Sequence, residues 1–500
     1  MTSSVSKSSQ ASHTLRREFS FGAAFAFAFA FISPIVALYG IFGLAISTAG
    51  PSFWWGFLIV FAGQFLVALV FAMLVSRWPL EGSIYQWATH LLGAGFGWFA
   101  GWFYIWTLTI AMATVALGAA GFIANIIGIH DASGTQVALI AFVVLVLGTL
   151  INLTGRGILK AFMMASIVAE VIGSIGLGVW LLIAHREQDL SVLFDGGASL
   201  GVSEEYFSLG GPFLLAIVFI GFSFVGFESA GSIAEEVHEP RRNLPKAVLF
   251  SICFIAAVVM FSSLAIILAT PDNAAELPGF DVDPVFAVLT AQLGLEFALP
   301  LQALFTIGFI ASFLALQTSA SRLIWAKARD RALPFSGALS KLSRKQRQPV
   351  GPILITTVIG TALFLLSNIA ENLYTMMVNF TSGGFYLSFL FPVLAFAIAV
   401  LRRRWRPGPF SIGAWTTPVA VIALLWVVFE LINIAWPRPL NGNPWLDWSV
   451  IVGAAALTLV GAATYARVRK RIENSEASAM LLALDDDHVS ENAEKAVGKS

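Results

Sequence analysis

Three glutamates lie deep inside apolar stretches of this 500-residue chain: Glu170, Glu228 and Glu430. A carboxyl removed from water favours its neutral form, so a glutamate near mid-membrane can bind and release a proton close to neutral pH. Lys and Arg are absent at comparable depth in these stretches. Because an ionisable group inside a membrane is costly, each glutamate is a hypothesis for a functional site.

The three glutamates predict different roles. Glu170 lies about ten residues into its stretch, roughly 15 Å deep at 1.5 Å per residue, and we expect it to bind and release the coupling proton of whatever process the protein performs. Its alternative is a permanently protonated carboxyl that donates one hydrogen bond. Glu228 is also expected in proton coupling, with a structural role in tying loosened backbone as its alternative. For Glu430, towards the outer end of its stretch, a satisfied interhelical hydrogen bond is the preferred interpretation.

The stretches that hold these residues are long enough to be membrane helices, which need about 20 apolar residues. A run without Asp, Glu, Lys or Arg covers 19–76 and is divided at Pro51. Similar stretches follow at 98–125, 135–154, 161–184, 211–234, 247–270, 298–321, 351–369, 375–400, 413–435 and 448–466. They are about twice as long as barrel strands, and apolar all round. We therefore predict an all-α polytopic membrane protein with about twelve helices.

Composition and charge agree with this class. The chain is 58% hydrophobic and 12% charged, against about 25% charged in soluble domains. All but two of the 29 Lys and Arg, Arg186 and Arg438, fall on one side of the predicted membrane, which predicts that both termini are cytoplasmic. Residues 1–18 are polar, and the first apolar stretch is too long for a cleavable signal peptide.

Partners follow from the same features. A net charge of zero gives no field for nucleic acid, and the single Cys253 excludes a Cys-based metal cluster. None of the six histidines is placed for a His-rich metal site. We expect the lipid bilayer as a partner, no nucleic acid and no cofactor.

Two of the predicted helices are interrupted. The first contains Ser33-Pro34 and then Gly40, and the sixth contains the segment 221–227, GFSFVGF. Helix 1 begins inside and helix 6 begins outside, and this inverted placement points to an alternating-access transporter with a mid-membrane site. The competing interpretation is that small residues simply permit close helix packing.

Four segments carry a family resemblance: PLEGSIYQWA (Pro79 to Ala88), GFESAGSIAEEVHEPRRNLPKAV (Gly226 to Val248), SASRLIWAKARDRALPFS (Ser319 to Ser336) and RPGPFSIGAW (Arg406 to Trp415). In this order they resemble the first cytoplasmic loop, helix 6 with its following loop, the end of helix 8 and the loop before helix 11 of the amino acid–polyamine–organocation superfamily. The last segment is similar to the amino acid/choline transporter branch.

The resemblance implies a five-plus-five inverted repeat with two further C-terminal helices. It divides the chain into a cytoplasmic tail 1–18, a transporter domain 19–470 and a cytoplasmic tail 471–500. Within the domain it implies repeats at about 19–185 and 207–401, followed by helices 11 and 12 at about 413–466.

The resemblance also implies a substrate held between the unwound parts of helices 1 and 6. Carried over by spacing, the substrate-binding residues are Ser33, Ile35, Val36 and Ala37 in helix 1, and Phe222, Val225 and Gly226 in helix 6. Many members have Gly-Ser-Gly at 35–37, where glycine lets a carboxylate approach the backbone. Amines, γ-amino acids and choline-like cations therefore stay open beside α-amino acids. Glu170 falls where some proton-dependent members carry a lysine.

The leading hypothesis is a plasma-membrane secondary transporter for amino acids or related amino compounds, using alternating access and a proton gradient. Its alternative is an exchanger or facilitator for choline, GABA or polyamines. An enzyme is disfavoured because the loops are short and lack a His-rich or paired-Asp motif, and a channel because no repeated pore motif is visible. A non-transporting sensor with the same fold stays open.

Weaker signals complete the list. Trp98, Trp102 and Trp106 predict a packing stripe, with a cation-binding cage as the alternative. The segment 327–347 predicts an inside-facing loop. The pairs 235–236 (Glu-Glu) and 241–242 (Arg-Arg) predict either cytoplasmic salt bridges that open with transport or solvated loop charges.

Overall fold

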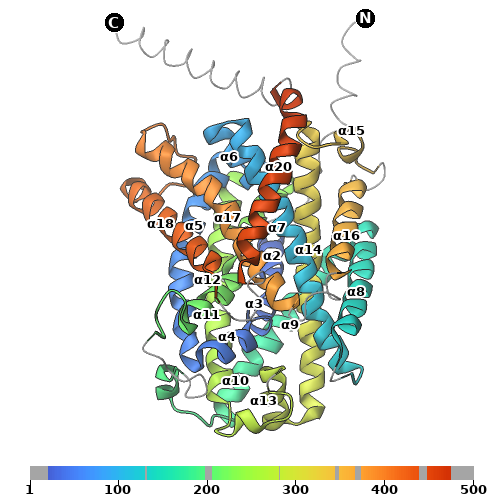
Figure 1. Ribbon diagram of the computed structural model, residues 1–500, viewed down its shortest axis with the longest axis vertical. Helices are drawn as coiled ribbons and strands as arrows, with labels where there is room; N and C mark the ends of the chain where they lie inside the picture. The colour runs from blue at the N-terminus through green and yellow to red at the C-terminus, as the bar shows by residue number, and fades with distance from the viewer. Residues whose placement is uncertain are drawn as a thin grey trace, which may run out of the picture.

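The computed structural model describes residues 21–129, 132–196, 205–280, 282–343, 348–365, 373–438 and 447–473. This part of the chain forms helices that run mostly along one long axis, without a β-strand (Figure 1). Ten described helices are long and apolar enough to cross a membrane, or eleven when the bent pair Ala24–Tyr39 with Phe42–Ala49 is one span. The predicted all-α polytopic membrane fold is confirmed.

Most spans are uninterrupted helices at the predicted places. They are α5 (Trp54–Arg77), α7 (Ala94–Ile126), α8 (Gly134–Thr154), α12 (Pro240–Leu268), α14 (Leu295–Arg329), α17 (Leu373–Leu401), α18 (Thr416–Ala435) and α20 (Ser449–Glu473). The shorter α16 (Val350–Phe364) occupies the ninth predicted stretch, whose last residues, 366–369, lie outside the described residues. Helices form because a backbone in lipid must satisfy its own hydrogen bonds.

Three spans are interrupted. Helix 1 consists of α2 (Phe21–Ile32), α3 (Pro34–Tyr39) and α4 (Phe42–Ala49), and helix 6 of α11 (Pro212–Gly221) and the 3-10 segments η5 (Phe222–Phe224) and η6 (Phe227–Glu236). Helix 5 consists of α9 (Arg156–Glu170), the π-helical η2 (Val171–Gly176) and α10 (Leu177–Ala184). The breaks in helices 1 and 6 were expected, whereas the π segment was not.

Short elements mark the two ends of the bundle. At one end lie α6 (Ile84–Leu92) and α15 (Ser336–Leu339), at the top of Figure 1, and at the other lies α13 (Pro284–Leu293). We call them the α6 end and the α13 end. Short 3-10 turns complete the described connections: η1 (Pro51–Phe53), η3 (Leu190–Phe194), η7 (Ala274–Glu276) and η9 (Gly413–Trp415).

The interrupted helices 1 and 6 lie in the middle of the bundle. The α2 helix packs against α12, α14 and η6, while η5 packs against α3. Helices α18 and α20 are peripheral, since α18 covers α5 and α17 and α20 lies along α7. The division into two inverted repeats stays a prediction, and both predicted tails lie outside the described residues except for 471–473, which continue α20.

Candidate functional site

The break in helix 1 is centred on Ser33. Its φ of 44° is in the left-handed region, which a residue with a side chain rarely adopts, and Pro34 then starts α3 at a position where no backbone donor is needed. The Ser33 hydroxyl accepts a hydrogen bond from the Val36 N–H at 3.3 Å. The sequence thus ends one helix and caps the next within two residues.

The carboxylate of Glu170 closes this break. Its Oε2 accepts the Ile35 N–H at 2.9 Å, and its Oε1 accepts the Ser33 hydroxyl. Ser174, one turn further along helix 5, donates to Oε2 at 3.3 Å. Glu170 is 2% exposed, so these contacts are made away from water. The backbone N–H that the resemblance offers to a substrate carboxylate is therefore held by a carboxylate of the protein itself.

Glycines on neighbouring helices leave room for the large side chain of Ile35. A Cβ on Gly308 of α14 would lie 3.1 Å from the Ile35 Cβ, and one on Gly173 of η2 would lie 3.6 Å from the Ile35 Cδ1. The Ile35 side chain fills this notch and leaves its N–H facing Glu170. The small residues that many family members carry on helix 1 have a counterpart here on helices 5 and 8.

The break in helix 6 has its own carboxylate. Val225 is extended and Gly226 has a φ of 101°, which requires glycine. The Gly226 N–H donates to Glu228 Oε2 at 3.0 Å, and the Tyr104 hydroxyl donates to Oε1 at 2.7 Å. A Cβ on Gly226 would lie 2.3 Å from the Phe31 ring, so the two breaks pack directly against each other.

The seven predicted substrate-binding residues are thereby brought together. All are buried, from 0 to 7% exposed for the side-chain-bearing members, and they lie on α2–α3 and η5–η6. Ser223, which sequence reasoning did not select, joins the two groups by donating its hydroxyl hydrogen to the Ala37 carbonyl. Their role in substrate binding stays a prediction, as does proton coupling by Glu170 and Glu228.

Glu430 lies apart from these breaks, on α18. It is fully buried, but neither carboxyl oxygen accepts a hydrogen bond from the described part of the chain. Asn433, one turn on, donates instead to the Leu214 carbonyl at 3.0 Å. The described residues thus provide no interhelical hydrogen bond to Glu430, and the predicted bond stays a prediction. Tyr386 faces Glu430, and its hydroxyl is likewise buried without a described hydrogen-bond partner.

The α6 end is closed by buried charges. The Arg322 Nε donates to Glu236 Oε1 at 2.7 Å, and Arg329 lies 3.4 Å from Glu235. Glu81 is fully buried beside them, and among the described residues neither of its carboxyl oxygens has a hydrogen-bond partner. Burial raises the pKa of Glu81 well above its usual range, and the nearby charges of Glu236 and Glu235 raise it further.

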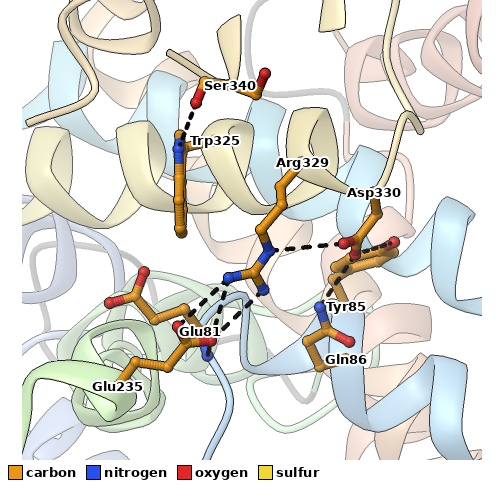
Figure 2. Close-up of polar contacts among 8 residues, drawn as sticks. All are labelled: Glu81, Tyr85, Gln86, Glu235, Trp325, Arg329, Asp330 and Ser340. Atoms are coloured by element: carbon orange, nitrogen blue, oxygen red, sulfur yellow. Dashed lines mark hydrogen bonds and ion pairs between the residues drawn. The ribbon is translucent and has the colours of Figure 1, made fainter. Parts of the chain in front are cut away.

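Figure 2 shows how this network continues to α6. The Tyr85 hydroxyl and the Gln86 amide donate to Asp330 Oδ2 at 2.9 and 3.2 Å, and the Arg329 Nε lies 3.7 Å from Oδ1 (Figure 2). Arg329 thus lies between Glu235 of helix 6 and Asp330, which accepts the hydrogen bonds from α6.

The structure corrects two predictions about these charges. Glu235 and Glu236 pair with Arg329 and Arg322 of α14, rather than with the arginines at 241–242. The start of the segment 327–347 is helical and not a loop, because α14 continues to Arg329.

The tryptophans of helix 3 belong to the same end. The buried Lys327 Nζ donates to the Trp98 carbonyl at 2.7 Å and lies 4.4 Å from the Trp98 ring centre. Trp98 stacks on Trp102, and Tyr465 of α20 covers Trp98. This stripe packs α7 against α20.

The α13 end is hollow. A cavity of about 530 Å³ lies between α3–α4, α7, α13 and α17. Tyr39, Phe122, Phe309 and Tyr374 line it, and Asp283 is the only Asp, Glu, Lys, Arg or His in its described lining. Tyr39 also donates its hydroxyl hydrogen to the Gly173 carbonyl at 2.8 Å, so the cavity wall is tied to the π segment of helix 5.

Sequence reasoning missed four contributors: Tyr39, Tyr104, Ser223 and the π segment. The tyrosines gave little signal, because a single hydroxyl on an apolar stretch is common. Glycines at 173 and 176 were the visible hint of the π segment, and π turns often lie at functional sites. Among the described residues, no group of three or more His, Cys, Asp or Glu is placed to hold a metal ion.

A helical membrane protein whose two interrupted helices meet in the middle of the bundle has the architecture of a secondary transporter. Residues 19–460 match the family model described as amino acid permease. The chain therefore belongs to the amino acid permease family, within the superfamily that the sequence resembles, and its class is transporter rather than enzyme.

Curated relatives agree across most of the chain. A putative amino acid/polyamine transporter of Macrophomina phaseolina is 23% identical, covering 82% of this chain and 93% of the relative. The branched-chain amino acid permease BcaP of Bacillus subtilis is 25% identical, covering 82% and 86%. The amino-acid permease BAT1 of Arabidopsis thaliana is 22% identical, covering 89% and 91%.

Proposed function

We propose that this protein is a plasma-membrane transporter that moves an amino acid together with a proton. The observation that carries the proposal is the hydrogen bond from the Ile35 N–H to the Glu170 carboxylate, 2.9 Å long and buried. The names of the curated relatives, which include a branched-chain amino acid permease and an amino acid/polyamine transporter, support an amino acid as the substrate.

Coupling follows from competition for one donor. An ionised Glu170 occupies the Ile35 N–H and the Ser33 hydroxyl, so a substrate carboxylate meets a like charge and no free donor. A proton on Glu170 removes that charge and weakens both bonds, because neutral acceptors are weaker than ionised ones. The substrate carboxylate can then take the N–H. Proton binding thus promotes substrate binding, which is the requirement for symport.

Access alternates in this proposal between the two ends of the bundle. The cavity at the α13 end is lined by Tyr39 and Gly40, which follow the break in helix 1, while the α6 end carries the buried ion pair of Arg322 with Glu236. Basic residues concentrate in the loops of the α6 end, so we assign that end and both termini to the cytoplasm. Glu228 holds the helix 6 break through Gly226 and Tyr104, and is proposed to move with it.

The test uses purified protein in proteoliposomes. A screen of labelled amino acids, with GABA, polyamines and choline included, first identifies a substrate. Glu170→Gln then keeps the size of the side chain and a hydrogen-bond donor but cannot titrate. We expect substrate exchange to survive, whereas accumulation driven by a pH gradient should vanish. Unchanged accumulation in this variant would overturn proton coupling, and uptake of no amino acid by the wild type would overturn the substrate class.

A further inference from the structure

The cavity at the α13 end has an acidic wall. Asp283 is the N-cap residue of α13, and its Oδ1 accepts the Phe286 N–H at 3.0 Å. Its Oδ2 accepts the Gln302 amide at 3.4 Å, a long bond. Within the described residues no Lys or Arg lies within ion-pair distance of this carboxylate. A charge at the wall of a large cavity is thus left without a counter-charge.

The surroundings of Asp283 make this charge unusual. Burial raises the pKa of Asp283 above its ordinary value, because a low-dielectric wall disfavours the anion. A cation beside it would offset that cost. Aromatic rings form part of the same wall, with Phe122 on α7, Phe309 on α14 and Tyr374 on α17. Ring faces attract ammonium groups by about 0.5–2 kcal/mol.

Asp283 also lies next to helix 1, at the start of α13. The ring of Pro284, the next residue, would lie 3.1 Å from a Cβ on Gly43 of α4, so α13 touches the outer half of helix 1 directly. Gly43 lines the same cavity. A ligand bound at Asp283 would therefore contact the segment that leads to the break at Ser33.

We propose that Asp283 and the aromatic wall form an external subsite that binds the ammonium group of the substrate before it reaches the breaks in helices 1 and 6. This inference rests on the proposed function, because it assumes a substrate with an ammonium group. The subsite recognises a primary amine and leaves the carboxylate of an amino acid free to approach the Ile35 N–H. The proposal therefore predicts that the cavity selects the substrate by its amino group and that the breaks in helices 1 and 6 select it by its carboxylate.

The deciding variant is Asp283→Asn. Asparagine caps helices about as well as aspartate, so the variant keeps the start of α13 and removes only the charge. Asp272→Asn is the matched control, because Asp272 is an exposed acid of the same end that accepts a hydrogen bond from Gln188 and is outside the described cavity lining. Thermal unfolding of both variants checks that they fold.

Two probes separate the subsite from transport. In detergent, n-butylammonium should raise the melting temperature of the wild type and of Asp272→Asn but not of Asp283→Asn, while butyrate should stabilise none of them through this site. In proteoliposomes, Asp283→Asn should raise the KM for the identified amino acid by about tenfold, equivalent to ~1.4 kcal/mol. External n-butylammonium should inhibit uptake by the wild type. It should inhibit uptake by Asp283→Asn only weakly or not at all.

The outcomes are distinguishable. Equal stabilisation of wild type and Asp283→Asn by n-butylammonium would overturn the subsite even if amino acid transport is established. A loss of maximal rate at unchanged KM would also overturn it, since that pattern belongs to a structural cap. Stabilisation that depends on Asp283 in a protein that transports no amino acid would support the subsite and defeat the proposed function.

Discussion

Carboxylates at the two ends of the bundle differ in whether they are paired with a basic residue. At the α6 end the carboxylates of Glu235 and Glu236 lie against arginines of α14, and the pair of Glu236 with Arg322 is buried whereas that of Glu235 with Arg329 is half-buried. At the α13 end a single carboxylate, Asp283, faces a cavity of about 530 Å³. Paired buried charges hold helices together, because separating them exposes each to an unfavourable environment. An unpaired charge at a cavity wall instead attracts a ligand.

This difference predicts that opening the bundle at the α6 end costs more free energy than opening it at the α13 end. The ion pairs there join helix 6 to helix 8, so any opening at this end must separate Glu236 from Arg322. The described residues show no ion pair across the cavity at the α13 end. Changes at the α6 end should therefore alter stability, and changes at the α13 end should alter transport.

The largest expected effect is the loss of one partner of the buried ion pair. Arg322→Leu removes the arginine that is hydrogen-bonded to the buried Glu236 and should lower the free energy of unfolding by about 3–5 kcal/mol. Denaturant unfolding in detergent measures it. The exposed pair of Arg186 with Asp189, 3.5 Å apart, provides the control, and Arg186→Leu should have little effect. Equal losses in the two variants would contradict the comparison.

The next effect concerns transport. A Cβ on Gly121, which lines the cavity from α7, would meet no atom within 4 Å. Gly121→Leu should fill the cavity without a clash and lower the rate of uptake by about tenfold or more, while stability is kept or rises slightly. Gly157→Leu is the matched control on α9, since Gly157 is equally unobstructed but lies outside the described cavity lining. Normal uptake by Gly121→Leu would show that the cavity is not on the transport path.

A smaller effect depends on pH. Because the pKa of Glu81 is raised in the closed protein, its proton contributes stability at low pH that is lost as pH rises through that raised pKa. The slope contributed by one proton is at most ~1.4 kcal/mol per pH unit. Melting temperatures across a pH series should fall more steeply for wild type than for Glu81→Gln. The exposed Glu276 serves as control, and Glu276→Gln should follow the wild type.

The smallest effect is expected at Glu430. Its carboxyl oxygens accept no hydrogen bond from the described residues, so Glu430→Met removes a polar group that gains little from its site. The free energy of unfolding should change by less than about 1 kcal/mol, or increase. A loss comparable to that of Arg322→Leu would show that Glu430 has a partner of its own, such as a bound water.

Most of the fold followed from the sequence, because charge-poor stretches of membrane length have few alternatives to a helix. The breaks near Ser33 and Gly226 were also visible, since proline and glycine punctuate helices by local chemistry. Contacts between distant segments were not visible. That Glu170 would hold the Ile35 N–H depends on how helix 5 lies against helix 1, and nothing in a local pattern reports it. For the same reason the partners of Glu235 and Glu236 were misassigned.

The π segment in helix 5 has a consequence for the length of the chain. The part of helix 5 before this segment, α9, packs against α14 and α2, and the part after it, α10, packs against α12. Successive residues of a helix advance by about 100°, so deleting one residue from 171–176 would turn α10 by about that angle relative to Glu170. The extra residue of the π segment rotates α10 relative to α9, so that α9 can face α14 and α2 while α10 faces α12. A regular α-helix would not place both halves in these directions. A single-residue deletion here should therefore harm the protein more than most substitutions at the same positions.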